Sequence, residues 1–480
     1  MRKTKIICTI GPVSDNYEML HKLALAGMNV VRLNMSHGQH DRCAQIIKSI
    51  RTLNKKLHHP VAVLIDTQGP EIRTGDLKNE LNLRPGDIIS VVARGEADVE
   101  SSSIHINYED LINDVTIGDK ITVDNGLINL EVLSKEERTM QCRVIDGGVL
   151  KSKRHVNLPG IRVNLPAITE KDRRDIAFAI EQAVDFIALS FVRSPDDIRE
   201  LKELLGDKAD KIKIIAKIED QEGVRNLEEI VKEAHGVMVA RGDLGVEIPL
   251  EELPIVQRRI IATCAKYGRR AIVATHMLES MIENPTPTRA EVTDVANAVY
   301  EEADCIMLSG ETTVGKYPIK CVEVLDRIAR AIERTRGLRF SDDLVMDNDK
   351  QEIAAAAVKL AESISAKAIV VPTRRGLMAN LVTNCHPQGP IICAFTNDSR
   401  TRRLLVMNRN VLSYRINFSS DPEKTLGTAA RIMMQRDEFN AQDKVVVISD
   451  ALSQHGVEAI QIRQLGDLAT KAGDLEELGD

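Results

Sequence analysis

Eight short apolar runs, most of them followed by an amphipathic stretch, organise the first two thirds of the chain. They are Lys5–Ile10, Asn29–Asn34, Val61–Asp66, Asp185–Ser190, Lys213–Lys217, Gly236–Ala240, Ala271–Thr275 and Cys305–Ser309. Continuous apolar runs of this length are typical of strands buried on both faces. Segments with helical spacing follow four of them, at Asp15–Ala26, Asp41–Asn54, Leu227–Ala234 and Ile255–Tyr267. Alternating strands and helices indicate an α/β fold with a parallel sheet, and eight such strands favour a closed (β/α)8 TIM barrel.

The regular alternation stops once, after Asp66. From Glu71 to about Pro166 the chain has short alternating runs and turn signals such as Arg84–Asp87 and Asp124–Gly126. This pattern predicts a small all-β domain inserted after the third barrel strand. The insertion is long enough to act as a lid.

A charged stretch, Asp342–Gln351, separates the barrel from a third region. An alanine-rich helical segment, Glu352–Ala366, precedes strand-like runs at Ala368–Pro372, Ile391–Phe395 and Lys444–Ser449. This pattern predicts an α/β domain with an open sheet. The chain then divides into a barrel (residues 1–70 and 167–342), a lid (71–166), an α/β domain (352–465) and an acidic tail (466–480). The tail has only a weak helical pattern, and we expect it to lie at the surface.

Composition narrows the class of protein. The chain has 480 residues, 43% hydrophobic and 28% charged, and is too long for a single hydrophobic core. Its net charge of −7 argues against nucleic acid as the main partner, and no apolar run approaches a membrane span. The eight cysteines include no CxxC pair, which favours reduced thiols. Because a strand begins almost at the amino terminus and leaves no room for a targeting peptide, we expect a cytoplasmic protein.

The stretch Ile214–Glu219 is the most informative in the chain, because an apolar strand ends there in a lysine and then a carboxylate. A second apolar run ends in Arg241 and Asp243. Lysine and glutamate are almost never fully buried without a partner, so these residues are not simple core. The active site of a (β/α)8 barrel lies at the carboxyl ends of its strands. The two strand ends therefore indicate a divalent-metal and phosphate site.

Polar residues close most of the other strands and are expected to meet at the same rim. They are Arg32, Asn34, Ser36, Asp66, Thr67, Glu71, Arg73, Ser190, Arg193, Thr275, His276, Ser309 and Glu311. Any one of them alone is more often a salt-bridge partner. Seven strand ends carry such groups, and isolated salt bridges do not explain all seven together.

The residue types at the rim divide by chemical role. Glu219 and Asp243 are hard oxygen ligands suited to Mg²⁺. Lys217 leaves the same strand face as Glu219 and suits a transferring phosphoryl group or an enolate. Arg32 and Arg73 are fork-shaped donors suited to phosphate. The remaining oxygens fit a monovalent cation better than a second Mg²⁺, and they belong to Asn34, Ser36, Asp66 and Thr67. For Asn34 and Ser36, a pair of side chains that caps a turn is an equally good interpretation.

Several motifs together carry a resemblance to a known family. They are Lys5–Pro12, Asn34–Gly38, Asp66–Arg73, Ile214–Glu219, Met238–Pro249, Asn284–Glu291, Asp294–Ala298 and Met307–Thr312. In these motifs, and over nearly its full length, the chain resembles the pyruvate kinases. The resemblance implies a (β/α)8 barrel with an inserted all-β lid after strand 3 and a C-terminal α/β regulatory domain. It also implies a homotetramer and an allosteric enzyme, with an effector that the sequence does not identify.

The resemblance implies a glycolytic reaction, in which the phosphoryl group of phosphoenolpyruvate passes to ADP to give pyruvate and ATP. By that analogy Arg32 holds the phosphoryl group and Lys217 stabilises the phosphoryl and enolate charge. Gly242 and Asp243 touch the substrate, and Asp243 also binds Mg²⁺ (or Mn²⁺) together with Glu219.

The same analogy assigns the remaining site residues. Thr275 lies by the methylene carbon of the substrate, and Ser309 is a candidate relay for the proton that converts the enolate to pyruvate. The nucleotide is bound by Arg73, Arg154, Asn34 and His37. K⁺ is held by Asn34, Ser36, Asp66 and Thr67.

Glu71 sharpens the expectation for K⁺. Family members with a lysine at this place resemble K⁺-independent enzymes, because the ammonium group replaces the ion. A glutamate adds negative charge and calls for the cation. We therefore predict that the activity depends on K⁺.

Two positions near the active site depart from the family pattern. The lid strand usually presents a lysine and then a glycine to the nucleotide phosphates, and here Arg154 and His155 stand there. Arginine still binds phosphate, but in a different geometry. Thr275 is followed by His276 where glutamine is usual. We favour an imidazole that only replaces the hydrogen bond of the amide over one that titrates in the reaction.

The C-terminal domain departs from the family in two effector loops. The loop Thr373–Ala379 is poor in hydroxyl donors, and its Leu377 and Met378 are poor phosphate partners. The last loop, Ser453–Glu458, carries a carboxylate that would repel a bisphosphate. We predict that fructose 1,6-bisphosphate does not activate this enzyme.

Two other classes of function compete with this interpretation. Another barrel enzyme of phosphoenolpyruvate or oxoacid chemistry would explain the metal carboxylates, but not the inserted lid or Arg73. A catalytically weak paralogue with a regulatory or binding role would explain the altered Arg154, His276 and effector loops. The intact set of Lys217, Glu219, Asp243 and Thr275 argues against that second alternative.

Overall fold

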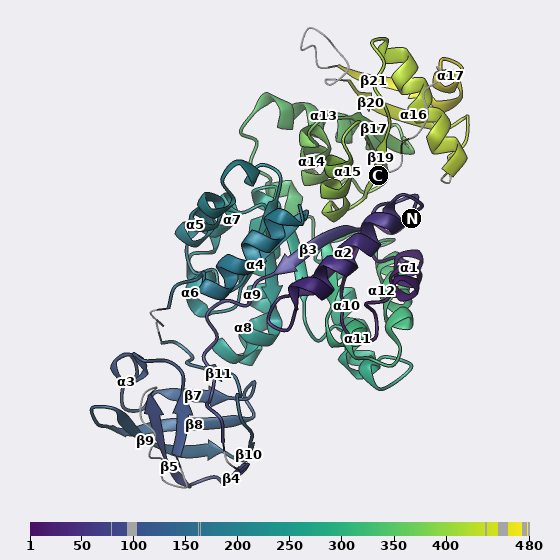
Figure 1. The fold of residues 1–480 in the computed structure, drawn as a ribbon. Helices are drawn as coiled ribbons and strands as arrows, with labels where there is room; N and C mark the ends of the chain where they lie inside the picture. The colour runs from purple at the N-terminus through teal and green to yellow at the C-terminus, as the bar shows by residue number, and fades with distance from the viewer. Residues whose placement is uncertain are drawn as a thin grey trace.

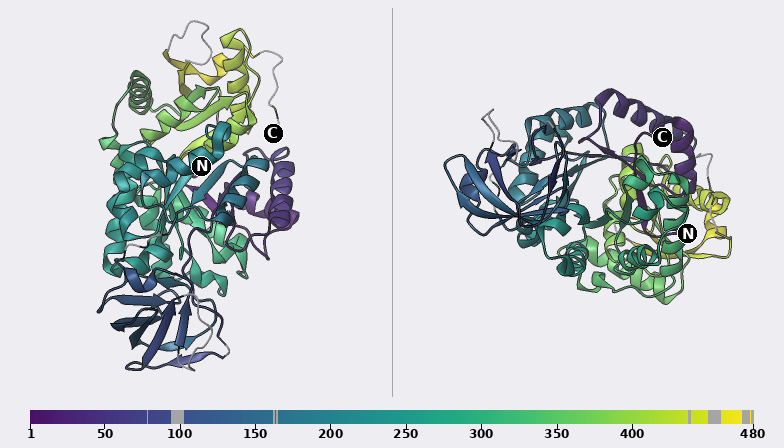
Figure 2. Two further views of the ribbon diagram at one scale, coloured as in Figure 1. Left: turned by 60° about the vertical axis from the view of Figure 1, so that its left-hand side comes forward. Right: turned by 90° about the horizontal axis from the view of Figure 1, so that it is seen from below.

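The computed structural model has three parts in a row, with a barrel between a β-rich lid and a C-terminal α/β domain (Figures 1 and 2). It describes residues 1–480 except 78, 94–102, 162, 164, 437–438, 450–458, 473–477 and 479–480. The lid interrupts the barrel sequence between its third and fourth strands. The predicted combination of a (β/α)8 barrel, an inserted β lid and a C-terminal α/β domain is confirmed.

Eight parallel strands form the closed barrel. They are β1 (Lys5–Thr9), β2 (Val30–Asn34), β3 (Ala62–Asp66), β12 (Phe186–Leu189), β13 (Lys213–Ile218), β14 (Gly236–Ala240), β15 (Arg270–Ala274) and β16 (Cys305–Leu308). Closure is made by β1, which pairs with both β2 and β16. Ile7 faces the barrel interior, whereas its neighbours Ile6 and Cys8 pack against the outer helices. This alternation explains why the strands are apolar without a break, since both faces are buried.

Helices surround the barrel and hold its loops (Figure 1). They are α1 (Tyr17–Ala26), α2 (His40–Asn54), α4 (Glu170–Glu181), α5 (Pro195–Leu205), α6 (Gln221–Arg225), α7 (Leu227–Glu233), α8 (Arg241–Glu247), α9 (Leu253–Lys266), α10 (Arg289–Tyr300), α11 (Gly310–Thr313) and α12 (Pro318–Ile332). Helix α4 begins at a capping box made by Thr169 and Asp172. Asp172 also accepts the backbone N–H groups of Gln68 (3.0 Å) and Gly69 (3.2 Å). The cap of α4 therefore fixes the point where the chain leaves β3 for the lid.

Short 3-10 helices complete the connections, at η1 (Gly206–Lys208), η2 (Leu250–Glu252), η3 (Glu279–Ile282), η4 (Phe340–Asp343) and η5 (Leu405–Met407). In the part of the chain that the structure describes, no helix has both the length and the apolarity needed to cross a bilayer.

The lid has its own sheet and its own core. Its elements are β4 (Leu81–Leu83), β5 (Ile88–Ala93), β6 (Ser103–Ile106), α3 (Leu111–Asp114), β7 (Lys120–Val123), β8 (Ile128–Lys135), β9 (Thr139–Asp146), β10 (Gly148–Leu150) and β11 (Val156–Asn157). Six strands form a sheet in the order β11-β7-β8-β9-β5-β6, and β10 pairs with β4. Alternate residues of β8, such as Leu130 and Val132, are buried in a core separate from that of the barrel. The lid is therefore a folded unit joined to the barrel by two connections.

The C-terminal domain covers the amino ends of the barrel strands. Its elements are α13 (Asp349–Ser363), β17 (Ala368–Pro372), α14 (Leu377–Asn384), β18 (Ile391–Thr396), α15 (Ser399–Leu404), β19 (Val411–Arg415), α16 (Pro422–Arg436), β20 (Lys444–Ile448), β21 (Ile460–Gln464) and α17 (Leu465–Ala469). Val406 and Met407 of this domain pack into the interior core of the barrel. Lys5 at the start of β1 donates to the carbonyl of Val411 (2.7 Å). The base of the barrel is thus occupied, and its rim is left to the lid.

Four barrel strands, β1, β12, β15 and β16, end one residue earlier than predicted. β15 ends at Ala274 because Thr275 and His276 have left-handed backbone conformations, with φ of 67° and 55°. β16 ends at Leu308, before Ser309. Both turns place a predicted site residue in the rim loop instead of in the strand.

The C-terminal domain contains strands that the sequence pattern did not reveal. Its sheet has the order β19-β18-β17-β20-β21, and β21 runs antiparallel to β20. The expectation of a surface tail from residue 466 was also partly wrong. Leu468 in α17 is only 1% exposed and belongs to the core of this domain.

Candidate active site

A cavity of about 340 Å³ opens between the barrel rim and the lid. Ten of the predicted site residues line it: Arg32, Asn34, Ser36, His37, Thr67, Arg73, Arg154, Lys217, Glu219 and Asp243. They come from the ends of β2, β3, β13 and β14 and from the lid. The structure thus brings together residues that are more than 200 positions apart in the chain.

Lys217 lies at the centre of the ionic groups. Its Nζ is 2.9 Å from Oε1 of Glu219 and 3.1 Å from Oδ1 of Asp66, and it donates to Oγ of Ser190 (2.7 Å). Burial alone would lower the pKa of Lys217, but Asp66 and Glu219 outweigh it and raise this pKa well above its usual range. Lys217 is therefore a fixed cation at the base of the cavity.

Side chains from the two neighbouring strands, β1 and β3, orient the guanidinium of Arg32. Its Nε donates to Oδ2 of Asp66 (2.6 Å), and its Nη1 donates to Oγ1 of Thr9 (2.9 Å). Burial would raise the pKa of Asp66, but Arg32 and Lys217 outweigh it and lower this pKa. Asp66 is a permanent anion that holds both cations in place, and the Arg32 guanidinium still lines the cavity.

Glu219 and Asp243 form a pair of crowded carboxylates. Their side chains lie against each other, and Oε2 of Glu219 accepts the backbone N–H of Phe191 (2.6 Å). Burial raises the pKa of both groups, and the charge of Asp243 raises the pKa of Glu219 further. The rim therefore holds a surplus of negative charge that a hard divalent cation would relieve.

The donor set fits Mg²⁺ on chemical grounds. Mg²⁺ is commonly bound through one or two carboxylates, with water and substrate oxygens completing the octahedron. Glu219 and Asp243 supply two such carboxylates. Within the described ranges of the chain, no group of three or more His, Cys, Asp or Glu side chains is arranged to hold a metal by itself. The pair suits a metal shared with a substrate better than a closed structural metal site.

Thr275, Gly242 and Ser309 lie beside the cavity without lining it. Oγ1 of Thr275 accepts the backbone N–H of Gly242 (2.8 Å) and donates to the carbonyl of Ala274 (2.6 Å). Thr275 thereby ties the end of β15 to the turn that carries Asp243. Oγ of Ser309 is buried and has no hydrogen-bond partner among the residues that the structure describes. His276 is exposed.

The four residues predicted to hold K⁺ lie on adjacent strand ends. Asn34 pairs in register with Asp66 across β2 and β3, and Ser36 and Thr67 follow them. Oδ1 of Asn34 accepts the backbone N–H of Ser36 (3.1 Å), as in the capping pair considered above. Asn34, Ser36 and Thr67 line the cavity, whereas Asp66 lies fully buried behind them.

The lid contributes a second set of charges. Oε2 of Glu71 accepts from Nε of Arg73 (2.7 Å) and from Nε2 of Gln68 (2.8 Å). Burial would raise the pKa of Glu71, but these two bonds outweigh it and lower this pKa. Nη1 of Arg73 donates to the carbonyl of Lys153 (2.9 Å), so Arg73 is already engaged. Nε of Arg154 is buried and has no partner in the described part of the chain, so this arginine keeps a donor for a ligand.

A larger chamber of about 500 Å³ adjoins the cavity on the α1–α2 side of the barrel. Arg32, Asn34 and His37 line both spaces. Ser309 and Thr313 from the end of β16 and from α11 line the far wall of the chamber. The arrangement offers one space for small charged groups and an adjoining, less polar space.

Three further residues from the predicted rim, Arg193, Arg241 and Glu311, do not line the cavity. Arg193 donates to the carbonyls of Val163 and Leu165. Arg241 pairs with Asp294 (2.7 Å) and donates to the carbonyl of Ala274. Glu311 accepts the backbone N–H groups of Leu278 (3.0 Å) and Ser309 (2.7 Å). Each of these side chains therefore holds a loop in place.

Two contacts at the rim were not foreseen. The hydroxyl of Ser190 accepts from Lys217 and donates to the carbonyl of Thr67 (2.7 Å), so it joins the lysine to the K⁺-type oxygens. The backbone N–H of Phe191, a residue with φ of 51°, holds Glu219. Ser190 was detectable as a polar strand end, whereas a backbone donor leaves no signal in a sequence.

Comparisons with known proteins agree with this fold. The family profile described as pyruvate kinase, barrel domain, matches residues 1–322, and the profile for the pyruvate kinase alpha/beta domain matches residues 351–460. Pyruvate kinase from Bacillus licheniformis is 42% identical over 98% of this chain and 82% of its own length. Plastidial pyruvate kinase 2 from Arabidopsis thaliana is 40% identical over 97% of this chain and 81% of its own length. The crystal structure of a pyruvate kinase from Cryptosporidium parvum superposes with a TM-score of 0.91 at 34% identity, over 97% of this chain and 96% of that chain.

The fold, the rim and these relatives define a phosphotransferase built on a (β/α)8 barrel with an inserted lid. The chain belongs to the pyruvate kinase family.

Proposed function

We propose that the protein transfers the phosphoryl group of phosphoenolpyruvate to ADP, giving pyruvate and ATP in glycolysis. The observation that carries this proposal is the buried cation Lys217, held by Asp66 and Glu219 beside Arg32 at the base of a lidded cavity. In the reaction the bond between phosphorus and the enolate oxygen breaks. A β-phosphate oxygen of ADP forms the new bond, and the methylene carbon of the enolate takes up a proton.

Lys217 and Arg32 stabilise the charge that moves. Because the pKa of Lys217 is raised, its ammonium stays charged at neutral pH, close to where phosphoryl and enolate oxygens would lie. Arg32 is held from behind by Asp66 and Thr9, so it presents its guanidinium without reorganising. A preorganised pair of cations lowers the barrier more than mobile ones do.

Glu219 and Asp243 are the residues that would hold Mg²⁺ or Mn²⁺. The metal would supply Lewis-acid neutralisation of phosphoryl and enolate oxygens. The raised pKa values of both carboxyl groups support this role, since burial leaves their charges poorly compensated and a bound cation would compensate them. The backbone bond from Phe191 keeps Glu219 pointed at the rim.

Thr275 and Ser309 suit the protonation of the enolate. Thr275 fixes Gly242, whose backbone together with Asp243 is positioned to bind the substrate. The unsatisfied hydroxyl of Ser309 supports a role as proton relay, because a buried hydroxyl without a partner is costly unless a ligand or water completes it.

Nucleotide binding is assigned to Arg73, Arg154, Asn34 and His37. The free Nε donor of Arg154 supports a phosphate contact. Nε of Arg73 already donates to Glu71 and Nη1 donates to the carbonyl of Lys153. Arg73 would therefore bind phosphate through the N–H groups that these bonds do not use. The adjoining chamber, reached past Asn34 and His37, suits the nucleoside part of ADP.

We further propose that K⁺ completes the site through Asn34, Ser36, Asp66 and Thr67. Three of these oxygen-bearing residues line the cavity on adjacent strand ends. One reason for this proposal was the negative charge that Glu71 adds to the site. The ion pair of Glu71 with Arg73 weakens that reason, since it largely compensates this charge within the lid. The requirement for K⁺ is therefore a sharp test of the oxygen cluster itself.

The effector loops support the prediction that fructose 1,6-bisphosphate does not activate the enzyme. In the loop Thr373–Ala379, Met378 is a buried core residue and Arg374 lies over the ring of Phe418, 5.4 Å from its centroid. Arg374 is nevertheless exposed, so the support from this loop is that Thr373 is its single hydroxyl residue. The second loop, Ser453–Glu458, lies outside the described residues. Strong activation by the bisphosphate at subsaturating phosphoenolpyruvate would refute the prediction.

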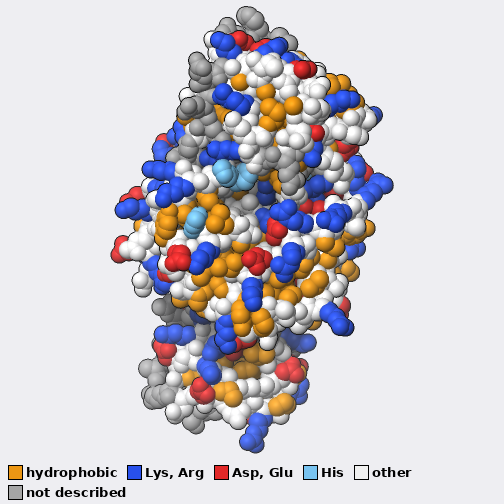
Figure 3. Space-filling model, turned by 90° about the vertical axis from the view of Figure 1, so that its right-hand side faces the viewer, with side chains coloured by type: hydrophobic (Ala, Val, Ile, Leu, Met, Phe, Trp, Pro, Cys, Tyr) orange, Lys and Arg blue, Asp and Glu red, His pale blue; other side chains and the backbone are white. Residues whose placement is uncertain are grey.

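Assembly and location remain predictions. A homotetramer follows from the family resemblance, and light scattering on the purified protein tests it. A cytoplasmic location is tested by cell fractionation. The face in Figure 3 carries Lys and Arg side chains interspersed with Asp and Glu, which, with the net charge of −7, supports the absence of a nucleic-acid partner.

Pyruvate formation in a coupled assay with phosphoenolpyruvate, ADP, Mg²⁺ and K⁺ tests the proposed reaction. Robust turnover would support it. Turnover close to background, together with retained binding of phosphoenolpyruvate, would instead favour the alternative of a catalytically weak paralogue with a regulatory role. The intact rim around Lys217 favours turnover.

A further inference from the structure

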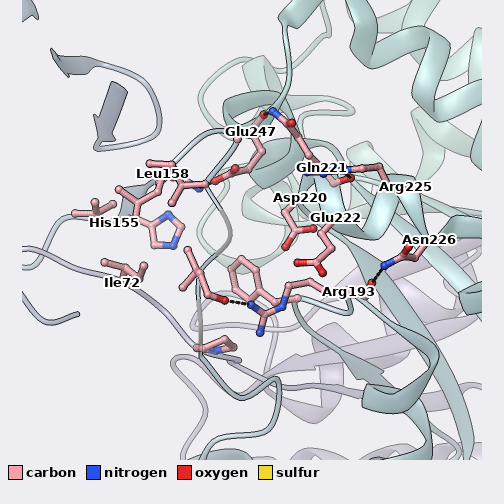
Figure 4. A pocket seen from close by; sticks show the side chains of 17 residues that line it. Ile72, His155, Leu158, Arg193, Asp220, Gln221, Glu222, Arg225, Asn226 and Glu247 are labelled. Carbon is pink, nitrogen blue, oxygen red and sulfur yellow. Dashed lines mark hydrogen bonds between the residues drawn. The ribbon is translucent and has the colours of Figure 1, made fainter. Parts of the chain in front are cut away.

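The imidazole of His155 lies between two spaces at the lid side of the active site. It lines the catalytic cavity and also a neighbouring pocket of about 260 Å³ where the lid joins the barrel. Figure 4 shows His155 on the lid side of that pocket, together with Ile72 and Leu158. The reaction proposed above gives this ring no role.

The backbone of the lid places His155 directly opposite Arg73. The segments 72–74 and 154–156 exchange two backbone hydrogen bonds, each of 2.8 Å, and Arg73 and His155 are the antiparallel pair between those bonds. The side chains of such a pair are the closest in an antiparallel ladder. The ring therefore lies beside an arginine that we assign to the nucleotide phosphates.

A chain of hydrogen-bonding side chains reaches the ring from the barrel. Nδ2 of Asn157 donates to Oε1 of Glu247 in α8 (2.8 Å), so Oδ1 of Asn157 is the atom within hydrogen-bond contact of the His155 ring. An amide oxygen only accepts, and the ring nitrogen that faces it must therefore carry a proton. In the neutral ring, the other nitrogen is then a bare acceptor. A phosphate oxygen, which is also an acceptor, bonds to that nitrogen only after the ring has gained a second proton.

The permanent cations of the lid wall already have partners. Three cations of the lid line the catalytic cavity, and each has a carboxylate within 4 Å. The pairs are Arg73 with Glu71 (2.7 Å), Arg154 with Asp124 (3.6 Å) and Lys153 with Asp76 (3.3 Å). Among the described lid residues that line the cavity, His155 is the one whose charge changes near neutral pH.

Without an anionic ligand, the ring is neutral at physiological pH. Burial lowers the pKa of His155 below its ordinary value of 6.5, and Arg73 lowers this pKa further, although Glu71 and Glu219 act in the opposite direction. A diphosphate next to the ring would raise the pKa, because an opposite charge favours the charged form. The charged groups that face the ring come from three elements: Glu71, Arg73, Asp124 and Arg154 from the lid, Glu219 from the end of β13, and Glu247 from α8.

We propose that His155 is a nucleotide-binding residue that takes up a proton from solvent when the nucleotide arrives and donates it in a hydrogen bond to the terminal phosphate. This inference rests on the proposed function, because it needs a diphosphate between the lid and the rim. The protonated ring supplies a cation that has no carboxylate partner of its own. Asn157 keeps the ring oriented in both charge states, since its Oδ1 accepts from the same nitrogen throughout.

The proposal fixes the direction of the pH dependence. Between the pKa of the free ring and the higher pKa of the bound ring, each diphosphate that binds takes up as much as one proton. The affinity therefore falls as the pH rises through this window, by up to about tenfold per pH unit. Below the pKa of the free ring, the ring is protonated with and without the ligand, so no uptake is expected there.

Calorimetry of ADP binding to the full-length protein counts the protons. Titrations with Mg²⁺ at pH 7.5, in buffers of different ionisation enthalpy, should show an uptake about 0.5 proton per site larger in the wild type than in His155→Gln. Glutamine keeps an N–H donor but does not titrate. Contributions from the ADP phosphate and from His37, which also lines the cavity, are the same in both proteins and cancel. Equal uptake in the two proteins would overturn the proposal.

The dissociation constant of ADP gives a second readout. At pH 6.5, His155→Gln should bind ADP about tenfold more weakly than the wild type, because a charge-assisted hydrogen bond is lost. At pH 8.5 the difference should disappear, since the wild-type ring is then largely neutral. A difference that stays the same from pH 6.5 to 8.5 would show that His155 only supports the lid.

Two further variants separate the charge of the ring from the fold of the lid. His105→Gln is the matched control, because His105 lies in β6 of the same lid but does not line the catalytic cavity. It should keep the proton uptake and the affinity of the wild type. His155→Arg carries a permanent charge and should bind ADP without the additional uptake. The melting temperature checks that each variant is folded, and loss of the uptake in His105→Gln would contradict the assignment to His155.

Pyrophosphate separates this inference from the proposed reaction. If pyrophosphate binds with an uptake that depends on His155, in a protein that forms no pyruvate, the proposed function fails and the role of His155 stands. Pyruvate formation with equal uptake in the wild type and His155→Gln would keep the proposed function and remove this role. Failure of both ADP and pyrophosphate to bind would contradict both.

Discussion

Two ionic clusters lie at opposite ends of the barrel and differ in how completely the charges of their carboxylates are compensated by neighbouring cations. At the base, Asp185 accepts from Arg403 (2.9 Å) and from the backbone N–H of Val63 (2.9 Å). At the rim, Lys217 and Arg32 face three carboxylates, the buried Asp66 and Glu219 and the half-buried Asp243.

A second carboxylate at the base of the barrel also has both a cation and a backbone donor as partners. Asp304, just before β16, faces Arg270 (3.4 Å) and accepts the backbone N–H of Ala271 (2.9 Å). Each base carboxylate thus has a cation and a backbone donor, and the cation at Asp185 comes from the docked C-terminal domain. A balanced cluster joins two domains, whereas the unbalanced cluster at the rim retains charge for a ligand.

Replacing Lys217 should produce the largest effect. Lys217→Met removes the cation between Asp66 and Glu219, and we expect kcat to fall on the order of 10³-fold, since a preorganised charge at the reacting group is lost. Steady-state assays with phosphoenolpyruvate and ADP measure this. Lys213→Met is the matched control, because Lys213 lies at the other end of the same strand and should leave kcat nearly unchanged. A loss of less than tenfold in Lys217→Met would remove Lys217 from the chemistry.

Breaking the base cluster should affect stability instead of catalysis. Arg403→Met leaves Asp185 buried without its cation, which destabilises the protein by about 3 kcal/mol. Thermal denaturation should show a clear fall in melting temperature, with kcat retained at low temperature. Arg400→Met, in the same helix but only half-buried, serves as the control. An unchanged melting temperature with a lowered kcat would reverse the contrast between the two clusters.

The requirement for K⁺ tests the oxygen cluster at the rim. Replacing K⁺ by tetramethylammonium should lower the activity at least about tenfold, equivalent to roughly 1.4 kcal/mol in the barrier. Glu71→Lys should restore activity without K⁺, because its ammonium reaches the place of the ion. Glu80→Lys, which changes the same charge on an exposed part of the lid, should remain dependent on K⁺. Full wild-type activity without K⁺ would eliminate this role for Asn34, Ser36, Asp66 and Thr67.

The smallest expected effect is a dependence of stability on pH. Burial raises the pKa of Glu247 from about 4.5 when unfolded to about 7 when folded. The folded protein therefore binds more protons between these values, and its stability falls as the pH rises through this window. Glu247→Gln removes the penalty and should be more stable than the wild type by about 1–2 kcal/mol at pH 8, with no advantage below pH 4.5.

Melting temperatures of Glu247→Gln at pH 4.5, 6 and 8 measure this dependence. The exposed Glu251→Gln should show no difference from the wild type at any of these values. An advantage of Glu247→Gln that is equal at all three would show that packing, and not the charge, is responsible.

Much of the fold and of the rim was predictable because both depend on local pattern. Apolar strands in a barrel alternate between two buried faces, and the two-residue period of β13 puts Lys217 and Glu219 on one side. A strand end is a position that sequence alone identifies. The same rule brought Asp243 and Arg32 to the rim.

The remaining features depend on partners that are distant in the sequence. Arg241 was expected at the rim but is held by Asp294, and Arg193 turns to the end of the lid segment. Leu468 is buried because α17 packs against α16. The short acidic sequence of this segment gives no signal of that packing. The short strand β21 was missed because it lies at a sheet edge and is only half-buried.

The pairing of β1 with β16 has a consequence for biosynthesis. Lys5 lies opposite Cys305, so one edge of the first strand has no partner until 300 further residues have been made. At roughly 5–20 residues per second this takes about 15–60 s on the ribosome. The lid, which is complete by Asn157, emerges during that interval with a core of its own. The nascent chain thus carries a finished domain in the middle of an open sheet, and its first strand is the part that needs protection.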